Sequence, residues 1–261
     1  AGSAPRAWMR PDDMRSETFA EARASAIAVL PAMVAVIPFS LLLGALAAQK
    51  GITPLEMMLM SATVFAGSAQ FVAVDIWREP APWLLLTVTA LLINIRHLLM
   101  GASLASKIGH FGTGTSLLAL FTMVDETWAL SEQRAGRKKL TPAYVLTMGG
   151  ILWVSWVGWT TLGATLGSLM GDPAVYGADF AFPAIFLTLL VGLWQGPRTG
   201  IAIAASAVVA AIVHLTVDGP WFIAAGGIAG ALAGAVFAPT GDEAAETGRE
   251  VGAQTGLEPD K

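Results

Sequence analysis

No cysteine occurs among the 261 residues, so a disulfide framework and a thiolate metal site are both excluded. Charged residues are scarce, at 13% of the chain, and only three histidines are present. A soluble globule of this length needs more polar surface. With 55% apolar residues and a mean hydropathy of +0.64, the composition predicts an integral membrane protein. The net charge is −4, carried mainly by the tails and one loop, so nucleic acid is not an expected partner.

Unbroken apolar runs such as 83–93 and 201–213 exclude a barrel, whose strands would alternate between apolar and polar residues. The expected fold class is therefore an all-α integral membrane protein with about eight transmembrane helices. Residues 1–24 are predicted to form a polar cytoplasmic segment, 25–238 the transmembrane transporter domain, and 239–261 an acidic, disordered tail. The expected spans are 25–48, 55–76, 82–105, 113–131, 143–170, 179–196, 199–217 and 220–238.

Lysine and arginine are distributed unevenly over the loops between these spans. One side of the membrane receives only Lys50 and Lys107. The other side carries Arg6, Arg10, Arg15, Arg23, Arg78, Arg134, Arg137, Lys138, Lys139, Arg198, Arg249 and Lys261. Because positively charged loops stay in the cytoplasm, both termini are predicted to be cytoplasmic.

One arginine, Arg96, lies inside an expected span, where a charge costs about 2.5–3.5 kcal/mol. It therefore needs an acidic partner, and Asp125 and Glu126 are the acids embedded at a comparable depth. One interpretation is a structural ion pair that fixes two helices in register. The other is a proton relay, in which one acid pairs with Arg96 and the surplus carboxylate, favoured as Glu126, titrates beside His97 in a cavity of low dielectric constant.

The segment 65–71, which reads FAGSAQF, places glycine, serine and glutamine in the middle of an apolar span. Its skeleton F-A-x-x-A-x-F recurs at 180–186, where Pro183 removes a backbone donor. Interrupted apolar segments in corresponding halves indicate a transporter's binding site. The second and sixth spans are therefore expected to break near Gly67 and Pro183 and to meet at mid-membrane, as copies of a parallel repeat. The alternative is chance matching in a chain rich in alanine and phenylalanine.

Glycines at small-xxx-small spacing mark two other expected spans. Gly163 and Gly167 lie in the fifth span, and Gly226, Gly230 and Gly234 lie in the last. Such stripes allow two helix backbones to approach closely, within this chain or with a partner subunit.

Four segments of the chain are similar to the signature segments of one transporter family, the AzlC family of bacterial branched-chain amino acid exporters. They are FAGSAQF at 65–71, NIRHLLMGASLA at 94–105, DET at 125–127 and DFAFPAIF at 179–186. The resemblance covers about residues 25–238. That family usually has threonine where this chain has Val124.

The resemblance implies a secondary transporter of the bacterial inner membrane that exports leucine, isoleucine, valine and, as a further candidate, methionine. It also implies a small AzlD-type membrane subunit as partner and no cofactor. For such a zwitterion, a break at Gly67 would offer free backbone N–H groups to the carboxylate. The substrate-binding residues expected are Gly67, Ser68, Gln70, Phe71, Asn94 and Pro183, and proton coupling or an ion pair is expected of Arg96, His97, Asp125 and Glu126.

Two other functional classes fit parts of the sequence. A channel, or a carrier for another small neutral solute, would also need a polar, titratable centre. An intramembrane serine protease would pair a G-x-S serine, here Ser103, with a histidine on a later helix, here His214. The protease reading leaves Arg96 and the paired acids unexplained.

Overall fold

The computed structural model describes residues 11–169, 187, 191, 194, 196–217 and 221–237. Every regular element in these residues is an α-helix, and four stretches are long and apolar enough to cross a membrane, which confirms the all-α membrane fold class. Contacts divide the chain into two units, one ending at Ile185 and the other beginning at Phe186. The helices described in the first unit are α1 (Pro11–Gln49), α2 (Pro54–Thr63), α3 (Gly67–Asp75), α4 (Trp83–Asn94), α5 (Arg96–Ile108), α6 (Thr113–Phe121), α7 (Asp125–Ala135) and α8 (Pro142–Leu169).

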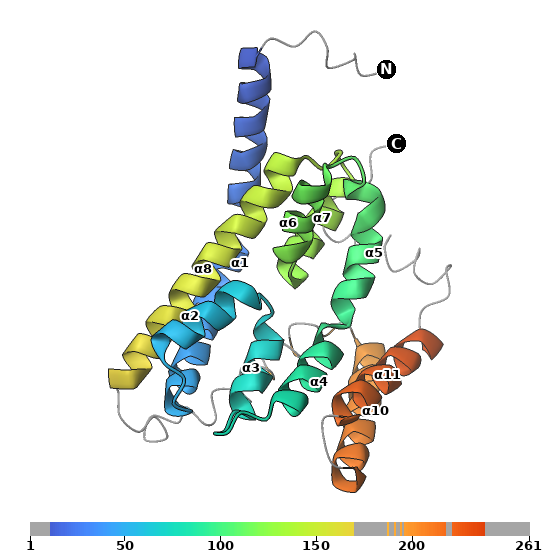
Figure 1. Ribbon diagram of the computed structural model, residues 1–261. Coiled ribbons are helices and arrows are strands. Elements are labelled where there is room, and N and C mark those ends of the chain that lie inside the picture. Colours follow the sequence, from blue (N-terminus) through green and yellow to red (C-terminus); the bar gives the residue numbers. More distant parts are fainter. Residues whose placement is uncertain are drawn as a thin grey trace. The chain divides into compact units, whose positions relative to one another are not determined.

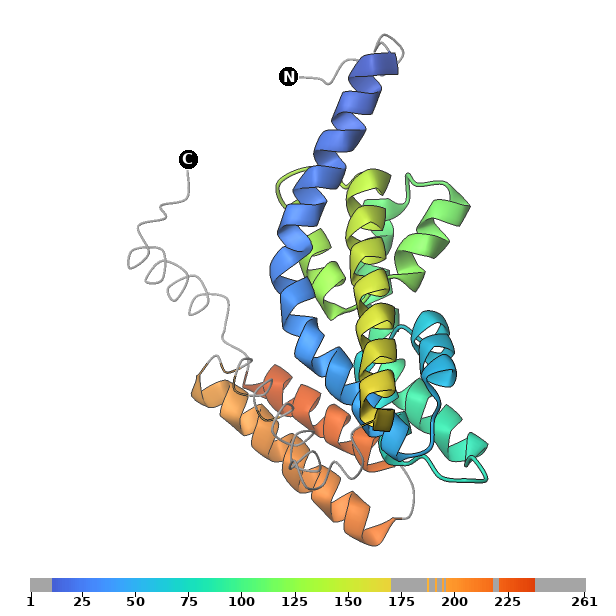
Figure 2. The same cartoon turned by 90° about the vertical axis from the view of Figure 1, so that its left-hand side faces the viewer.

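The two longest helices, α1 and α8, lie side by side and run in the same direction (Figure 2). Near the start of α8, the Tyr144 carbonyl accepts a hydrogen bond from the Ser25 hydroxyl of α1 at 2.6 Å. Further along, a Cβ atom on Gly163 would lie 2.2 Å from the carbonyl oxygen of Leu41, so only glycine allows the backbones to come this close. The close approach predicted from the Gly163 stripe is confirmed as packing within this chain.

Helices α2 and α3 form a hairpin that returns to the side from which it started. The break expected near Gly67 is confirmed, because α2 ends at Thr63 and α3 begins at Gly67. Lys50, which precedes α2, donates from Nζ to the carbonyl of Asp75 at the end of α3, at 2.8 Å. The expected second span therefore enters the membrane region and turns back at 64–66, so it is a re-entrant hairpin, here named hairpin 1.

Helices α4 and α5 together form the stretch Trp83–Ile108, which is long enough to cross the membrane. The third expected span is thus present, but α4 ends at Asn94 and α5 begins at Arg96. The interruption at Ile95 was not expected from the sequence. It places Arg96 in the first turn of a new helix, half-way along the span.

Helices α6 and α7 form a second re-entrant hairpin, here named hairpin 2. The Nε2 atom of His110, before α6, lies 3.0 Å from the carbonyl oxygen of Leu140, after α7. Lys107 near the end of α5 forms an ion pair with Glu132 near the end of α7. The segment 113–131, expected to be a fourth span, therefore turns back at 122–124 and does not cross.

The base of hairpin 2 is fastened to α1 by an ion-pair cluster. Arg134 donates from Nη2 to both carboxylate oxygens of Glu21, at 2.9 and 2.8 Å, and Lys138 donates to the same carboxylate at 2.5 Å. The guanidinium of Arg134 also lies 4.8 Å from the ring centre of Tyr144. Glu21 is only 7% exposed, so the cluster holds α1, α7 and the start of α8 together.

The described part of the first unit contains two similar halves of opposite direction. In each half a membrane-crossing stretch, α1 or α4–α5, is followed by a re-entrant hairpin at its far end. Hairpin 1 lies in the lower part of this unit in Figure 1 and hairpin 2 in the upper part. These two halves form an inverted repeat that the sequence did not predict, and the parallel repeat predicted between 65–71 and 180–186 stays a prediction. The second copy of that motif, with Pro183, lies outside the described residues.

The two hairpins also change how the charged loops are assigned to the two sides. Arg78 follows hairpin 1 and shares a side with Lys50, whereas eight crossing spans would place these two residues on opposite sides. Lys107 lies on the same side of the membrane as the base of hairpin 2, and not on the side of Lys50 as expected. That side now carries Arg15, Arg23, Lys107, Arg134, Arg137, Lys138 and Lys139. Because Arg78 and Lys107 exchange sides, the bias in positive charge is as strong along the observed path as along the expected one.

In the second unit, helices α10 (Pro197–Thr216) and α11 (Trp221–Val236) pack against each other in opposite directions. A Cβ on Gly226 would lie 2.9 Å from the Cβ of Ala210, and one on Gly230 would lie 3.1 Å from that of Ser206. The last glycine stripe thus also serves packing within the chain. These two helices match the seventh and eighth expected spans.

Candidate functional site

Arg96 lies where the two hairpin tips and the interruption in the central span come together. Its Nη2 atom donates to the Ser68 hydroxyl at 2.7 Å, and its Nη1 atom lies 2.9 Å from Oδ2 of Asp125. Ser68 is in the first turn of α3, and Asp125 is the first residue of α7. One guanidinium therefore connects hairpin 1 to hairpin 2, since its rigid fork can serve two partners at once.

The ion pair expected from the sequence is confirmed, and the structure selects Asp125 over Glu126 as the partner of Arg96. The side chains of Arg96 and Asp125 are 42% and 51% exposed, and Glu126 beside them is exposed as well. Charged groups at this depth are costly when they face lipid. This side of the first unit therefore faces protein or water, as a transport path requires.

Both hairpins begin their second helix at the tip. The N-cap residue of α3, Ala66, provides no side-chain hydrogen bond to the first turn, so the amides of Gly67 and Ser68 lack a side-chain partner there. At the start of α7, the Val124 amide donates to the Thr127 hydroxyl at 2.9 Å. The positive end of the α3 dipole and the Arg96 guanidinium thus meet at Ser68, and together they favour an anionic group.

Asn94 and His97 flank the interruption at Ile95. Within the described residues, the Oδ1 atom of Asn94, the Nδ1 atom of His97 and the Nε atom of Arg96 are buried and make no hydrogen bond. Buried polar atoms nearly always have a partner, so this group of atoms is suited to water or a polar ligand.

Gln70 and Phe71 point into the scaffold. Trp156 of α8 donates from Nε1 to Oε1 of Gln70 at 2.7 Å, and Gln70 donates from Nε2 to the Ser61 hydroxyl at 3.0 Å. Thr160 of α8 donates to the same hydroxyl at 2.9 Å. Both ends of the Gln70 amide are therefore engaged, and the side chain is 1% exposed. The expected substrate contact is corrected to a role in holding hairpin 1 on α8.

Phe71 is 3% exposed, so it too belongs to the packed interior. Gly67 has a packing role as well, because a Cβ there would lie 2.8 Å from the ring of Trp156. Of the six expected substrate residues, the structure leaves Ser68 and Asn94 beside Arg96, and Pro183 lies outside the described residues.

The serine of the protease alternative is part of the contact between α5 and α7. The Ser103 hydroxyl lies 3.0 Å from a carboxylate oxygen of Glu132 and accepts a hydrogen bond from Nε1 of Trp128 at 2.8 Å. His214 lies in the second unit, with its ring 5.1 Å from that of Phe222. Among the described residues, no group of three or more histidine, cysteine or acidic side chains could hold a metal ion.

A family model described as "AzlC protein" matches residues 31–170, more than half of the chain. The chain belongs to the AzlC family. The matched region contains both hairpins and Arg96. The inner membrane protein YgaZ of Escherichia coli (strain K12) is 30% identical over 210 residues, which cover 78% of this chain and 85% of that protein. The branched-chain amino acid transport protein AzlC of Bacillus subtilis (strain 168) is 26% identical over 192 residues, 69% of this chain and 71% of that protein.

An uncharacterized membrane protein of Archaeoglobus fulgidus is 30% identical over 197 residues, 75% of this chain and 86% of that protein. No solved structure gives a significant match. This AzlC-family chain is thus an integral membrane protein.

Sequence reasoning missed several residues that build the site of this AzlC-family protein. Thr160 and Trp156 carry the polar contact between α8 and hairpin 1, and the signal available was a polar side chain inside an apolar span. The turn at 122–124, which places Asp125 at a helix start, reads as Thr-Met-Val and has no breaking residue. The turn is revealed by the structure alone, in which His110 before α6 and Leu140 after α7 lie 3.0 Å apart.

Proposed function

We propose that this protein is a secondary transporter that exports branched-chain amino acids from the bacterial cytoplasm, with leucine, isoleucine and valine as substrates and methionine as a further candidate. The observation that carries the proposal is the single arginine, Arg96, that joins the tips of two oppositely inserted hairpins. Membership of the AzlC family supports transport, and the printed name of the Bacillus subtilis relative supports the class of substrate.

The chemistry of the site suits a zwitterion. The substrate carboxylate binds where the first turn of α3 and Arg96 meet, at Ser68. The substrate ammonium binds at the acidic start of α7, and Asn94 offers an amide with an unused oxygen. Because a carboxylate at this point competes with Asp125 for Arg96, substrate binding weakens the link between the two hairpins. A closed link without substrate and a loosened one with substrate describe a carrier better than an open channel.

Proton coupling is assigned to Glu126. Asp125 is the acid that neutralises Arg96, so the neighbouring carboxylate is the one that can gain and lose a proton during transport. Glu126 is exposed and directly follows Asp125 in the first turn of α7. His97, with its unpaired Nδ1 atom, is the next residue along the same route.

The protein acts as the large subunit of a two-component exporter, with a small AzlD-type membrane protein as partner. The half-exposed ion pair supports this, since it needs further protein or water to cover it. The bias in positive charge, with Arg134, Arg137 and Lys138 on the same side as the start of α1, supports a cytoplasmic N-terminus in the inner membrane. The C-terminus is proposed to lie on the same side.

The direct test is counterflow of labelled leucine in vesicles that contain the chain with and without its small partner. We expect uptake of label into vesicles preloaded with unlabelled leucine, and competition by isoleucine and valine. Competition by methionine would add it to the substrates. No uptake of any neutral amino acid in either preparation would overturn the proposal.

A further inference from the structure

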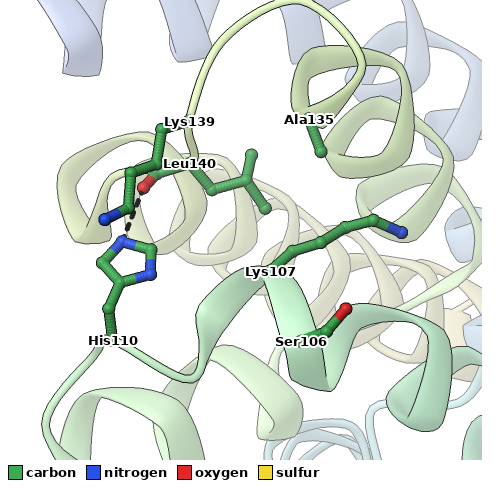
Figure 3. A pocket seen from close by; sticks show the side chains of 6 residues that line it. All are labelled: Ser106, Lys107, His110, Ala135, Lys139 and Leu140. Atoms are coloured by element: carbon green, nitrogen blue, oxygen red, sulfur yellow. Dashed lines mark hydrogen bonds between the residues drawn. The ribbon is translucent and has the colours of Figure 1, made fainter. Parts of the chain in front are cut away.

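A pocket of about 370 Å³ lies at the base of hairpin 2, away from the Arg96 centre. It is formed by the end of α5, the end of α7 and the two loops that are joined by His110 and Leu140. The lining residues are Ser106, Lys107, His110, Ala135, Lys139 and Leu140 (Figure 3). Three of the six are basic or can become so, which makes the pocket a candidate site for an anion.

The basic side chains lie on two sides of the pocket. In Figure 3, Lys139 and His110 lie together on one side, whereas the Lys107 side chain extends away from them on the other. Lys107 is shared with the carboxylate of Glu132, so it offers only part of its charge. Lys139 is exposed and makes no hydrogen bond or ion pair to any residue that the structure describes, so its ammonium is available to a ligand. The His110 Nε2–H donates to the Leu140 carbonyl, so Nδ1 can donate to an anionic ligand when the ring is the imidazolium.

The surroundings of the pocket favour a ligand that also has an apolar part. The pocket lies at the end of α5, where the membrane-crossing stretch Trp83–Ile108 stops, and α6 begins shortly after its lining residue His110. Exposed leucines lie further from the pocket on both helices, at the opposite end of α5 and in the middle of α6. They are Leu98 and Leu99 on α5, at 73% and 75% exposed, and Leu117 and Leu118 on α6, at 63% and 56%. Leu98 and Leu99 lie about 12–14 Å along α5 from Lys107, at 1.5 Å per residue, which is within reach of the acyl chains of a lipid whose phosphate lies in the pocket.

We propose that this pocket binds the phosphate of an anionic phospholipid, with the acyl chains lying along the exposed leucines of α5 and α6. Basic pockets at the ends of membrane helices suit such headgroups, because the charged phosphate stays at the interface while the chains remain in the apolar layer. A free phosphate offers the same charge to Lys139 and His110, but it has no apolar part that could contact the exposed leucines. The bound lipid would connect the loops at 109–112 and 136–141, and so stabilise the base of hairpin 2.

The test is a titration of the purified full chain, in neutral detergent, with fluorescent phosphatidylglycerol. Unlabelled phosphatidylglycerol, phosphatidylcholine and inorganic phosphate then serve as competitors. We expect competition by phosphatidylglycerol alone. Lys139→Gln and His110→Gln should each weaken binding about fivefold, the loss expected for one basic contact near the membrane surface. Both variants should fold, since Lys139 has no described partner to lose and glutamine can still donate to the Leu140 carbonyl.

Arg137→Gln is the matched control, because Arg137 is exposed on the same loop, carries the same charge and does not line the pocket. Its affinity should equal that of the unmodified protein. Equal weakening in this variant would show diffuse attraction to surface charge and would overturn the proposal. Competition by inorganic phosphate as strong as that by phosphatidylglycerol would assign the pocket to a soluble anion. Equal competition by phosphatidylcholine would remove the anionic requirement, and both results contradict a site for an anionic lipid.

Discussion

Asp125 and Glu126 are neighbours in the sequence, yet the structure gives them different surroundings. Asp125 lies 2.9 Å from the Arg96 guanidinium and also begins α7, so its charge is compensated twice, by the arginine and by the helix dipole. Glu126 is exposed next to this pair. Two acids with one arginine leave a surplus carboxylate, which is the group suited to exchange protons.

Glu126→Gln is expected to fold normally but to lose proton-driven export. The amide keeps the shape of the side chain and can still form hydrogen bonds, yet it cannot carry a proton. Exchange of internal for external leucine should survive, because exchange requires reorientation of the loaded carrier without proton release. The measurement is leucine efflux from vesicles with an imposed pH gradient, compared with counterflow at equal pH.

Asp125→Asn serves as the matched comparison and should show the opposite balance. Arg96 loses its counter-charge, so the yield of stable protein should fall more than the pH dependence of transport does. If Glu126→Gln still concentrates leucine at the unmodified rate, Glu126 is not the proton carrier. His97 would then be the next residue to test.

At the scale of single elements, α7 begins with an incomplete cap. Val124 is the N-cap residue, in an extended conformation with φ −129° and ψ 173°, but valine has no oxygen to accept a bond from the first turn. Its amide does donate to the Thr127 hydroxyl at 2.9 Å. Half of a reciprocal capping box is therefore present.

Val124→Thr should complete the box and stabilise the protein by about 1 kcal/mol, because the new hydroxyl can accept from the Thr127 amide. The measurement is thermal unfolding of the purified protein in detergent. Val124→Ala is the control, since it changes the same side chain without adding an acceptor, and it should give no stabilisation. A threonine variant no more stable than the alanine variant would contradict the capping geometry.

The contact between α1 and α8 depends on a glycine at a defined position. A Cβ on Gly163 would lie 2.2 Å from the Leu41 carbonyl oxygen, whereas one on Gly158 of the same helix would meet nothing within 4 Å. Gly163→Ala should therefore destabilise the protein by about 1–3 kcal/mol, as over-packing does. Gly158→Ala should be neutral or stabilising by about 0.5–1 kcal/mol, because alanine favours the helix. The measurement is thermal unfolding of both variants. Equal stability of Gly163→Ala and Gly158→Ala would contradict the close packing of α1 on α8 at Gly163.

At the scale of the whole molecule, the two re-entrant hairpins decide which loops share a side. Without native cysteine, a single introduced thiol reports its own position. Cysteines at Arg78 and at Arg137 should be labelled from opposite sides of the membrane, because hairpin 1 and hairpin 2 each return to the side they came from. The measurement is labelling by an impermeant thiol reagent in oriented vesicles. Crossing of both segments would place the two residues on the same side, and such a result would refute the hairpins.

The break at Gly67 and the pairing of Arg96 with an acid could be predicted from the sequence, because both follow from the cost of polar groups in an apolar span. The sequence could not predict that each hairpin returns to the side from which it started. About twenty apolar residues have the same composition whether they cross the membrane or turn back half-way. Likewise, Gln70 stands out as polar in the sequence, but only the positions of Trp156 and Ser61 show that its amide is already engaged.

In the proposed mechanism, substrate passes through the point where Arg96 joins the two hairpin tips. Arg96→Lys is the decisive variant, since lysine keeps the positive charge near Asp125 but lacks the fork that also reaches Ser68. In vesicles that also contain the small partner, leucine counterflow by this variant should fall about tenfold or more, with the protein still folded. Arg78→Lys, outside the site, should transport at the unmodified rate. Unmodified counterflow by Arg96→Lys would contradict the account.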